Sequence, residues 1–111
     1  MARFEALEIA FQLARALGPV LREVAQHDRD LSLQLRRAGA SVPSCMSEGA
    51  QRAGKDRLQL YRIAGGSAAE VRTQLQLAVA WGYVGEHDAA PVIELADRVV
   101  ALAWRLTHPR G

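Results

Sequence analysis

Arginine is the residue type whose number and placement could carry chemistry in this chain. Thirteen of the fourteen basic residues are arginine, in a sequence of 111 residues with a net charge of +2. Residues 29–72 hold eight basic and four acidic groups, a net charge of +4, whereas the segments on either side each carry −1. A guanidinium group can donate two parallel hydrogen bonds to a phosphate and can stack on a nucleobase. The middle of the chain is therefore a candidate for binding nucleic acid.

The candidate phosphate-binding residues fall in two places within this middle segment. Arg36 and Arg37 are adjacent, so on a helix their side chains point about 100° apart and cannot both face a core. The alternative is that one of them forms a packing ion pair with Glu48 or Glu70. The other basic residues cluster around the expected junction of the second and third helices: Arg52, Lys55, Arg57 and Arg62. An ordinary solvated surface would explain that cluster about equally well.

Side chains that catalyse reactions or bind metals are few and scattered. Arg22 and His27 have a spacing found in some helical ribonucleases, but thirteen arginines and three histidines produce about one such match by chance. Cys45 is the single cysteine, which excludes an intrachain disulfide, and it is most simply a small buried side chain. Glu70 is expected to be a hydrogen-bonded structural carboxylate. The sequence shows no nucleophile–base pair, phosphate-binding loop or metal-ligand spacing, so we expect neither an enzyme nor a cofactor.

Four helices are expected to position these residues. Half of the residues are hydrophobic but only 5% are aromatic, and the strong helix formers dominate. Apolar residues recur at helical spacing over residues 3–26, 31–51 and 54–80, and again in a fourth segment with Pro91 in its first turn. Short connections between four such helices predict a single all-α domain over residues 1–111, an antiparallel up-down-up-down four-helix bundle.

Particular residues mark the expected ends and bends of the helices. Asp30 is expected to cap the second helix, and Gly82 to adopt a left-handed conformation after the third. Gly18-Pro19 should kink the first helix and Pro43 should bend the second, because proline removes a backbone donor.

Two glycines in the middle of the third helix, Gly65 and Gly66, imply a close neighbour. Each interior glycine costs about 1 kcal/mol relative to alanine, so a packed element should offset the loss. Replacing Gly66 with leucine is therefore expected to destabilise the bundle by several kcal/mol, roughly as overpacking does.

The first and fourth helices have more apolar surface than a small bundle can bury. A helix that packs on one side needs one apolar stripe about 100° wide, and each of these helices has two. Trp81 and Trp104 are expected to be core or interface anchors. The excess predicts a homo-oligomer. No apolar run approaches the roughly 18 residues of a membrane span and no signal-peptide pattern is present, so a cytoplasmic location is expected.

Short motifs in the second and third helices carry a resemblance to a known family. The first set matches the pattern Q-L-R-R-A-x-x-S-I-P-x-x-x-x-E-G with Gln34-Leu35-Arg36-Arg37-Ala38, Ser41-Val42-Pro43 and Glu48-Gly49. The second set is Ile63-Ala64-Gly65-Gly66-Ser67, Glu70, Thr73-Gln74-Leu75 and Gly82-Tyr83. In order and spacing they resemble the four-helix-bundle proteins encoded in 23S ribosomal RNA intervening sequences. Relatives of that family include the accessory variability determinant (Avd) of diversity-generating retroelements.

The resemblance implies a non-enzymatic bundle that assembles into a barrel-like homopentamer. It also implies DNA or RNA as a partner and a reverse transcriptase as a further one, since the retroelement relatives bind both through basic surface. Binding should then weaken with salt, and removing Arg52, Lys55 and Arg57 together should weaken it similarly for all sequences. The alternative is a structural homo-oligomer or protein-interaction scaffold that binds no nucleic acid.

Overall fold

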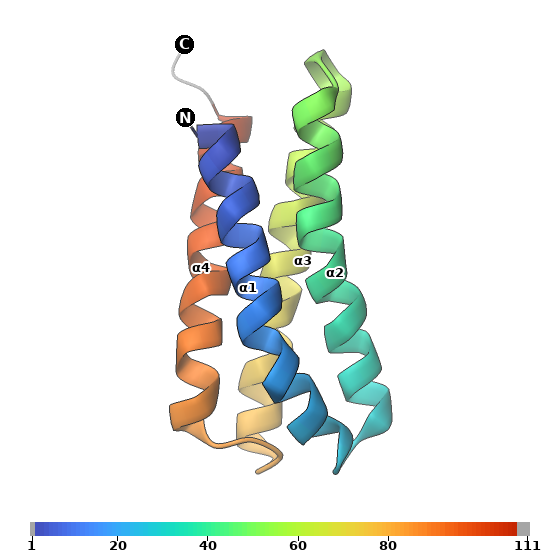
Figure 1. The fold of residues 1–111 in the computed structure, drawn as a ribbon, viewed down its shortest axis with the longest axis vertical. Coiled ribbons are helices and arrows are strands. Elements are labelled where there is room, and N and C mark those ends of the chain that lie inside the picture. Colours follow the sequence, from blue (N-terminus) through green and yellow to red (C-terminus); the bar gives the residue numbers. More distant parts are fainter. Residues whose placement is uncertain (1, 109–111) are drawn as a thin grey trace.

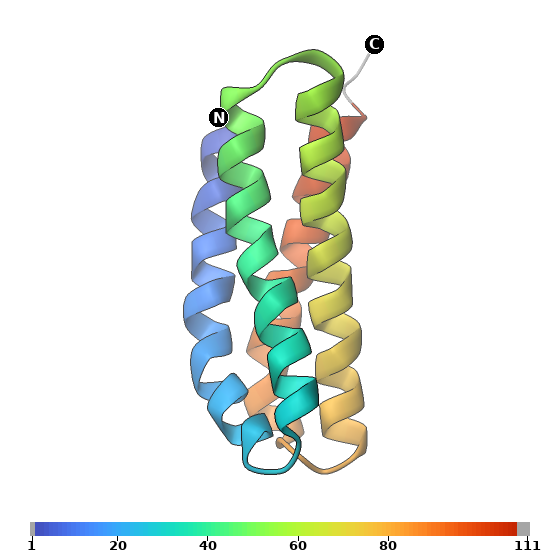
Figure 2. The same ribbon diagram turned by 90° about the vertical axis from the view of Figure 1, so that its right-hand side faces the viewer.

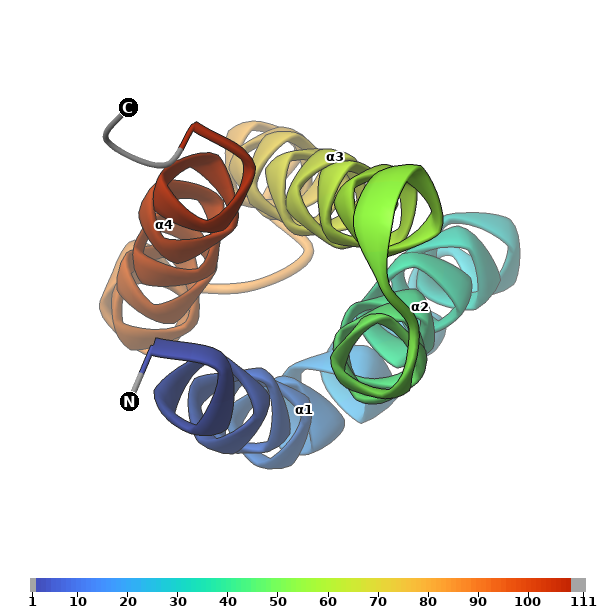
Figure 3. The same cartoon turned by 90° about the horizontal axis from the view of Figure 1, so that it is seen from above.

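Four α-helices account for most of the chain. The computed structural model describes residues 2–108, and its helices are α1 (Ala2–Ala25), α2 (Arg29–Gln51), α3 (Gly54–Ala80) and α4 (Glu86–Thr107). The helices lie side by side along one long axis (Figure 1), and seen along that axis they surround a common core in the order α1, α2, α3, α4 (Figure 3). Residues 2–108 contain no β-strand, and none of their helices is long and apolar enough to cross a membrane. The predicted all-α four-helix bundle is confirmed.

The connections divide between the two ends of the bundle. The α1–α2 and α3–α4 connections lie at one end, and the α2–α3 connection lies at the other (Figures 1 and 2). The first turns of α1, the first turns of α3 and the last turns of α4 therefore share one end of the molecule.

Each helix contributes aliphatic side chains to the core. Leu13, Leu35, Leu75 and Val99, one from each helix, are fully buried. The largest fully buried side chain is that of Tyr61, which the sequence analysis did not single out. Its ring lies against Gly49 of α2, where an added Cβ would be 2.6 Å from Tyr61 Cε1. Gly49 is therefore a position where the absence of a side chain makes room for the core, as is Gly39, where an added Cβ would be 2.5 Å from Leu17 Cδ2.

The start of α2 differs from the expectation. Asp28, not Asp30, is the N-cap: its Oδ1 accepts a hydrogen bond of 2.9 Å from the backbone N–H of Leu31. Asp30 lies inside the first turn and accepts a hydrogen bond from Gln34 Nε2 at 3.2 Å. Both aspartates can cap a helix, and the one that does so lets the helix begin two residues earlier than predicted.

The end of α3 follows the prediction. Gly82 has φ +78°, its N–H donates to the Val79 carbonyl, and the N–H of Tyr83 donates to the Ala78 carbonyl at 2.8 Å. This pair of hydrogen bonds satisfies carbonyls that a helix end leaves open, and it requires the left-handed residue. Val84 then packs back into the core.

The prolines lie within helices and do not end them. Pro19, Pro43 and Pro91 all lie inside helices. Figure 1 shows α1 changing direction in its last turns, after Pro19, and α2 continues without interruption across Pro43. The placement of Pro91 in the first turn was wrong, because α4 already begins at Glu86.

The glycine pair of α3 behaves differently at its two positions. A Cβ at Gly65 would lie 3.0 Å from Ala103 Cβ on α4, so a close neighbour is present there. Gly66 is exposed, and an added Cβ would meet no atom within 4 Å. The predicted loss of stability on replacing Gly66 with leucine is therefore wrong, because adjacent helix residues point about 100° apart and only one faces α4.

Tyr83 joins the two connections at one end of the bundle. Its ring stacks on that of His27, with centroids 5.3 Å apart and planes 7° from parallel. Removal from water raises the pKa of Tyr83 above its ordinary value of 10.0, and the negative charge of Asp28 and a hydrogen bond to it raise it further. The neutral phenol is thus favoured in the folded protein, so this contribution to stability is lost as pH rises through the native pKa.

Replacing Asp28 with asparagine separates the two roles of this residue. Asparagine caps a helix about as well as aspartate, so Asp28→Asn should leave the free energy of unfolding within a few tenths of a kcal/mol at neutral pH. It should lower the pKa of Tyr83, measured by phenolate absorbance, because the neighbouring charge is gone. Asp28→Ala should also lower it, and should cost about 1 kcal/mol through loss of the cap. An unchanged Tyr83 titration in both variants would contradict this account.

Candidate nucleic-acid interface

Arg36 and Arg37 both lie on the exposed face of α2. Neither forms an ion pair or a side-chain hydrogen bond within residues 2–108. The proposed partners are occupied elsewhere: Glu48 pairs with Arg52, and Glu70 accepts a hydrogen bond from Gln74 Nε2 at 3.1 Å. The alternative in which Arg36 or Arg37 pairs with one of these carboxylates is therefore wrong.

Arg29 extends this basic surface and was missed by the sequence analysis. It lies two turns before Arg36 on the same side of α2, because seven residues bring a helix almost back to the same direction. Arg29, Arg36 and the 37% exposed Leu33 line a surface hollow of about 400 Å³ beside the end of α1. The sequence analysis began the second helix at residue 31, which left residue 29 outside it. Choosing Asp28 as the N-cap would have placed residue 29 in the first turn of the helix.

The junction residues are largely engaged by the protein itself. Arg52 lies between Glu48, at 3.3 Å, and Asp56, at 3.9 Å, and Arg57 Nε donates to the Gly49 carbonyl at 3.1 Å. Arg57 thus adds a second hydrogen bond to a carbonyl at the end of α2 that also accepts one from the backbone N–H of Arg52 at 3.2 Å. Lys55 is exposed and takes part in none of the ion pairs found between described residues.

Arg62 lies apart from the other five predicted residues. It lines a hollow of about 250 Å³ between α3 and α4, together with Gly66 and Trp104. Arg36 and Arg52 are sixteen residues apart on one helix, a distance of about 24 Å. The six predicted residues therefore form no single patch. Arg36, Arg37 and Arg62 take part in no ion pair found between described residues, and of these Arg36 and Arg37 lie together on α2.

Two side chains with catalytic potential, those of His27 and Cys45, have neighbours that the structure describes. His27 stacks on Tyr83, and Cys45 is half-buried with its Sγ 3.7 Å from Ser41 Oγ. Among the described residues, no three histidine, cysteine, aspartate or glutamate side chains are placed to hold a metal ion.

The polar residues of the sequence motifs join α2 to α3. Ser67 Oγ donates to Ser41 Oγ at 2.8 Å, and Gln74 Nε2 reaches Gln34 Oε1 at 3.5 Å as well as Glu70. These residues therefore specify how the two helices pack.

Comparison with known proteins places this fold in a family. A family model described as the 23S rRNA-intervening sequence protein matches residues 2–104. The chain belongs to this family. A crystal structure of a protein of unknown function from the S23 ribosomal protein family of Bacteroides thetaiotaomicron matches with a TM-score of 0.89 at 17% sequence identity. That match covers 96% of this chain and 98% of the other, and it shows a shared fold. A comparison with curated proteins gives no match.

The family assignment gives the basic surface of α2 a context. The motif that contains Arg36 and Arg37 also contains Gln34 and Ser41, whose side chains bond to α3. Family members that keep this motif would thus hold the two arginines at the same place on the bundle.

Proposed function

We propose that this chain is a non-enzymatic, homo-oligomeric protein that binds DNA or RNA through the exposed arginines of α2. Its building block is the up-down-up-down bundle, with neighbouring helices antiparallel. The observation that carries the proposal is that Arg29, Arg36 and Arg37 share one exposed helix face and are neutralised by no ion pair among the described residues. Guanidinium groups in this setting favour phosphate ligands.

This surface is suited to phosphates more than to base edges. The side chains stand on a solvent-exposed helix with no neighbouring hydrogen bonds to fix their direction, so they can follow a phosphate backbone but cannot select a base pattern. Only Asp30 lies among them, which leaves a local charge of +2 over residues 29–37. Several copies in one assembly would multiply this modest charge.

The number of copies and the protein partner in this proposal come from the family resemblance. We propose that the assembly is a barrel-like homopentamer and that a reverse transcriptase is its protein partner, as the resemblance to retroelement accessory proteins implies. Gene neighbourhood would test the second point: a reverse transcriptase with template and variable repeats beside this gene is the expected finding, and its absence would contradict that partnership.

A structural scaffold is the second candidate function. It is favoured by the engagement of Arg52 and Arg57 in contacts within the chain, which leaves fewer basic groups for a ligand. The scaffold and the binding protein differ in one measurable property, which is affinity for nucleic acid.

Mobility-shift titrations decide between these candidates. The full chain would be titrated onto duplex DNA and single-stranded RNA of several unrelated sequences at about 50 mM salt, where phosphate contacts are strong. We expect retarded complexes with similar affinity for all sequences of one type. Absence of binding to any of them would reject the proposal in favour of the scaffold.

A further inference from the structure

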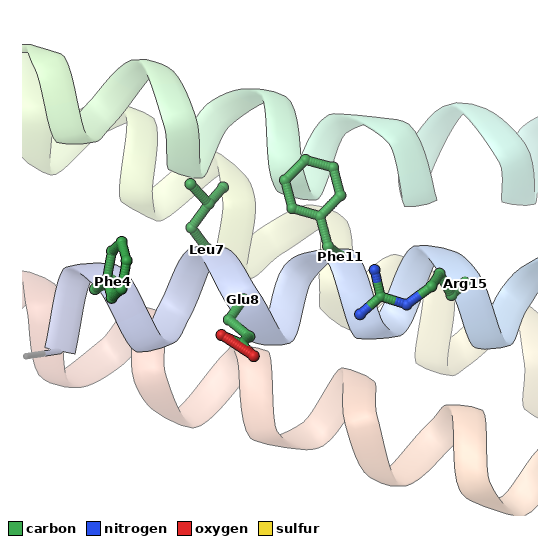
Figure 4. A pocket seen from close by; sticks show the side chains of 5 residues that line it. All are labelled: Phe4, Leu7, Glu8, Phe11 and Arg15. Atoms are coloured by element: carbon green, nitrogen blue, oxygen red, sulfur yellow. The ribbon is translucent and has the colours of Figure 1, made fainter.

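The outer face of α1 is apolar where a monomeric bundle should be polar. Phe4 is 78% exposed and Phe11 is 48% exposed, and with Leu7, Glu8 and Arg15 they line a surface hollow of about 320 Å³. Figure 4 shows Leu7 and Phe11 on the side of α1 towards α2, and Glu8 on the side towards α4. At 100° per residue, this face lies opposite the side of α1 that enters the core. The chain's own core therefore cannot cover it.

A complementary hollow lies between α3 and α4 at the same end of the bundle. It is the hollow lined by Gly65 and Gly66 on one side and Trp104 on the other. Trp104 is 60% exposed, and its ring stacks on that of His108 with centroids 4.1 Å apart. At Gly66, an added Cβ would meet no atom of the described residues within 4 Å. An aromatic side chain from outside could enter here.

Towards the other end, both surfaces become charged, with opposite sign. The apolar face of α1 continues into Arg15 and Arg22, which are exposed. The α3–α4 groove continues into a second hollow of about 360 Å³ with three carboxylates in its lining, Glu86, Glu94 and Asp97. Asp97 is bound to Arg72 at 2.8 Å, which leaves Glu86 and Glu94 to meet positive charge from outside.

The charged groups of the two surfaces are opposite in sign and lie at the same height along the long axis of the bundle. Arg15 lies thirteen residues from the start of α1, and Glu94 lies thirteen residues from the end of α4, so each is about 20 Å from the shared end. Arg22 and Glu86 lie at about 30 Å by the same measure. Near the shared end, Glu8 falls within the apolar face of α1 and Arg62 lines the apolar hollow.

We infer that the outer face of α1 docks into the α3–α4 groove of a second copy of this chain that points the same way. The inference rests on the homo-oligomer proposed above and names its contact. Phe4 and Phe11 fill the hollow at Gly66 and Trp104, while Arg15 and Arg22 face Glu94 and Glu86. In a copy that points the opposite way, the phenylalanines would meet the carboxylates, so charge selects the first orientation.

This contact is compatible with the closed ring proposed above. The two docking surfaces are different parts of the chain, so each copy offers one surface to each neighbour, and a repeated rotation closes the set. Because the surfaces lie at the same height, the rotation requires no shift along the bundle axis. The contact uses α1, α3 and α4 and leaves the arginine face of α2 accessible.

Variants that each remove one surface test the inference. Gly66→Gln places a side chain in the groove at a position where an added Cβ meets no atom within 4 Å, and Phe4→Gln with Phe11→Gln removes the aromatic side chains from an exposed face. Each should convert the wild-type oligomer into a 12.1 kDa monomer in light scattering, with an unchanged circular dichroism spectrum. Ala40→Gln, at an exposed position on α2 outside both surfaces, should leave the wild-type mass unchanged.

Mixing the two monomeric variants gives the sharpest outcome. The Gly66→Gln chain keeps an intact α1 face and the Phe4→Gln, Phe11→Gln chain keeps an intact groove, so together they should form a dimer of one chain of each kind. Variants that retain the wild-type mass, or a mixture that stays monomeric, would overturn the inference and leave the nucleic-acid proposal standing. A monomeric wild type would overturn both the docking and the oligomer, whereas lack of nucleic-acid binding would leave the docking intact.

Discussion

Replacing Gly49 with leucine is expected to lower the free energy of unfolding by about 2 to 3 kcal/mol, the range found for overpacked cores. A Cβ at this position would lie 2.6 Å from Cε1 and 2.9 Å from Cδ1 of Tyr61. The ring cannot move aside easily because Tyr61 is only 2% exposed. The gain of about 1 kcal/mol from removing a helical glycine only partly offsets this clash. Chemical denaturation followed by circular dichroism measures the change.

Two further variants control this prediction. Tyr61→Leu removes the ring, so the effect of Gly49→Leu should be smaller in that background than in the wild type, since residues in contact are not additive. Gly66→Leu makes the same substitution where an added Cβ meets no described atom within 4 Å. Made in the Phe4→Gln, Phe11→Gln chain, where the docking inferred above is already absent, it should leave stability unchanged or raise it by up to about 1 kcal/mol. Equal losses at Gly49 and Gly66 would contradict the packing described here.

The second large effect is expected on nucleic-acid affinity. Replacing Arg29, Arg36 and Arg37 together with glutamine should weaken binding to all sequences by about 100-fold or more near 0.1 M salt, because each lost phosphate contact forfeits the release of bound counterions. The three side chains are exposed and contact no partner among the described residues, so the fold should be unaffected. Mobility-shift titration measures the affinity, and circular dichroism checks the fold.

The matched control removes the same charge from the α2–α3 junction. Replacing Arg52, Lys55 and Arg57 with glutamine also subtracts three positive charges, but Arg52 and Arg57 are engaged by Glu48, Asp56 and the Gly49 carbonyl. Its effect on affinity should therefore be several-fold smaller than that of the α2 variant. Equal effects of the two variants would show that overall charge, and not the α2 surface, governs binding.

The helices were predictable from the sequence because apolar spacing reports a helix and its buried side directly. Leu35, Val42, Leu75 and Val99 all recur at this spacing and all are buried. The burial of Tyr61 was missed because its neighbour Leu60 is also apolar and also falls at helical spacing in this segment. Which of two adjacent residues faces the core cannot be decided before the packing partners are known.

The site was less predictable, for reasons that differ among its residues. Arg29 was missed because Asp30 was chosen as the N-cap of the second helix in place of Asp28. Both residues are aspartates, and either could cap a helix. The engagement of Arg52 could have been read from Glu48 and Asp56, which lie four residues before and after it on the chain. The sequence could not show which of Gly65 and Gly66 faces a neighbouring helix, because that depends on the position of α4.

The two tryptophans are not explained by the core of a single chain. Trp81 and Trp104 are 56% and 60% exposed, so neither is a core anchor in this chain. The excess apolar surface on α1 was visible in the sequence, but its match to the α3–α4 groove required the relative height of both surfaces.

The measurement that tests the central claim most directly is the salt dependence of nucleic-acid affinity. If the three α2 arginines of one subunit each neutralise a phosphate of duplex DNA, the slope of log affinity against log salt should be about −2.7, and steeper when more subunits engage. The variant that lacks the three arginines should show a correspondingly flatter slope. A wild-type slope near zero, or an equal slope in the variant, would contradict binding through the α2 surface.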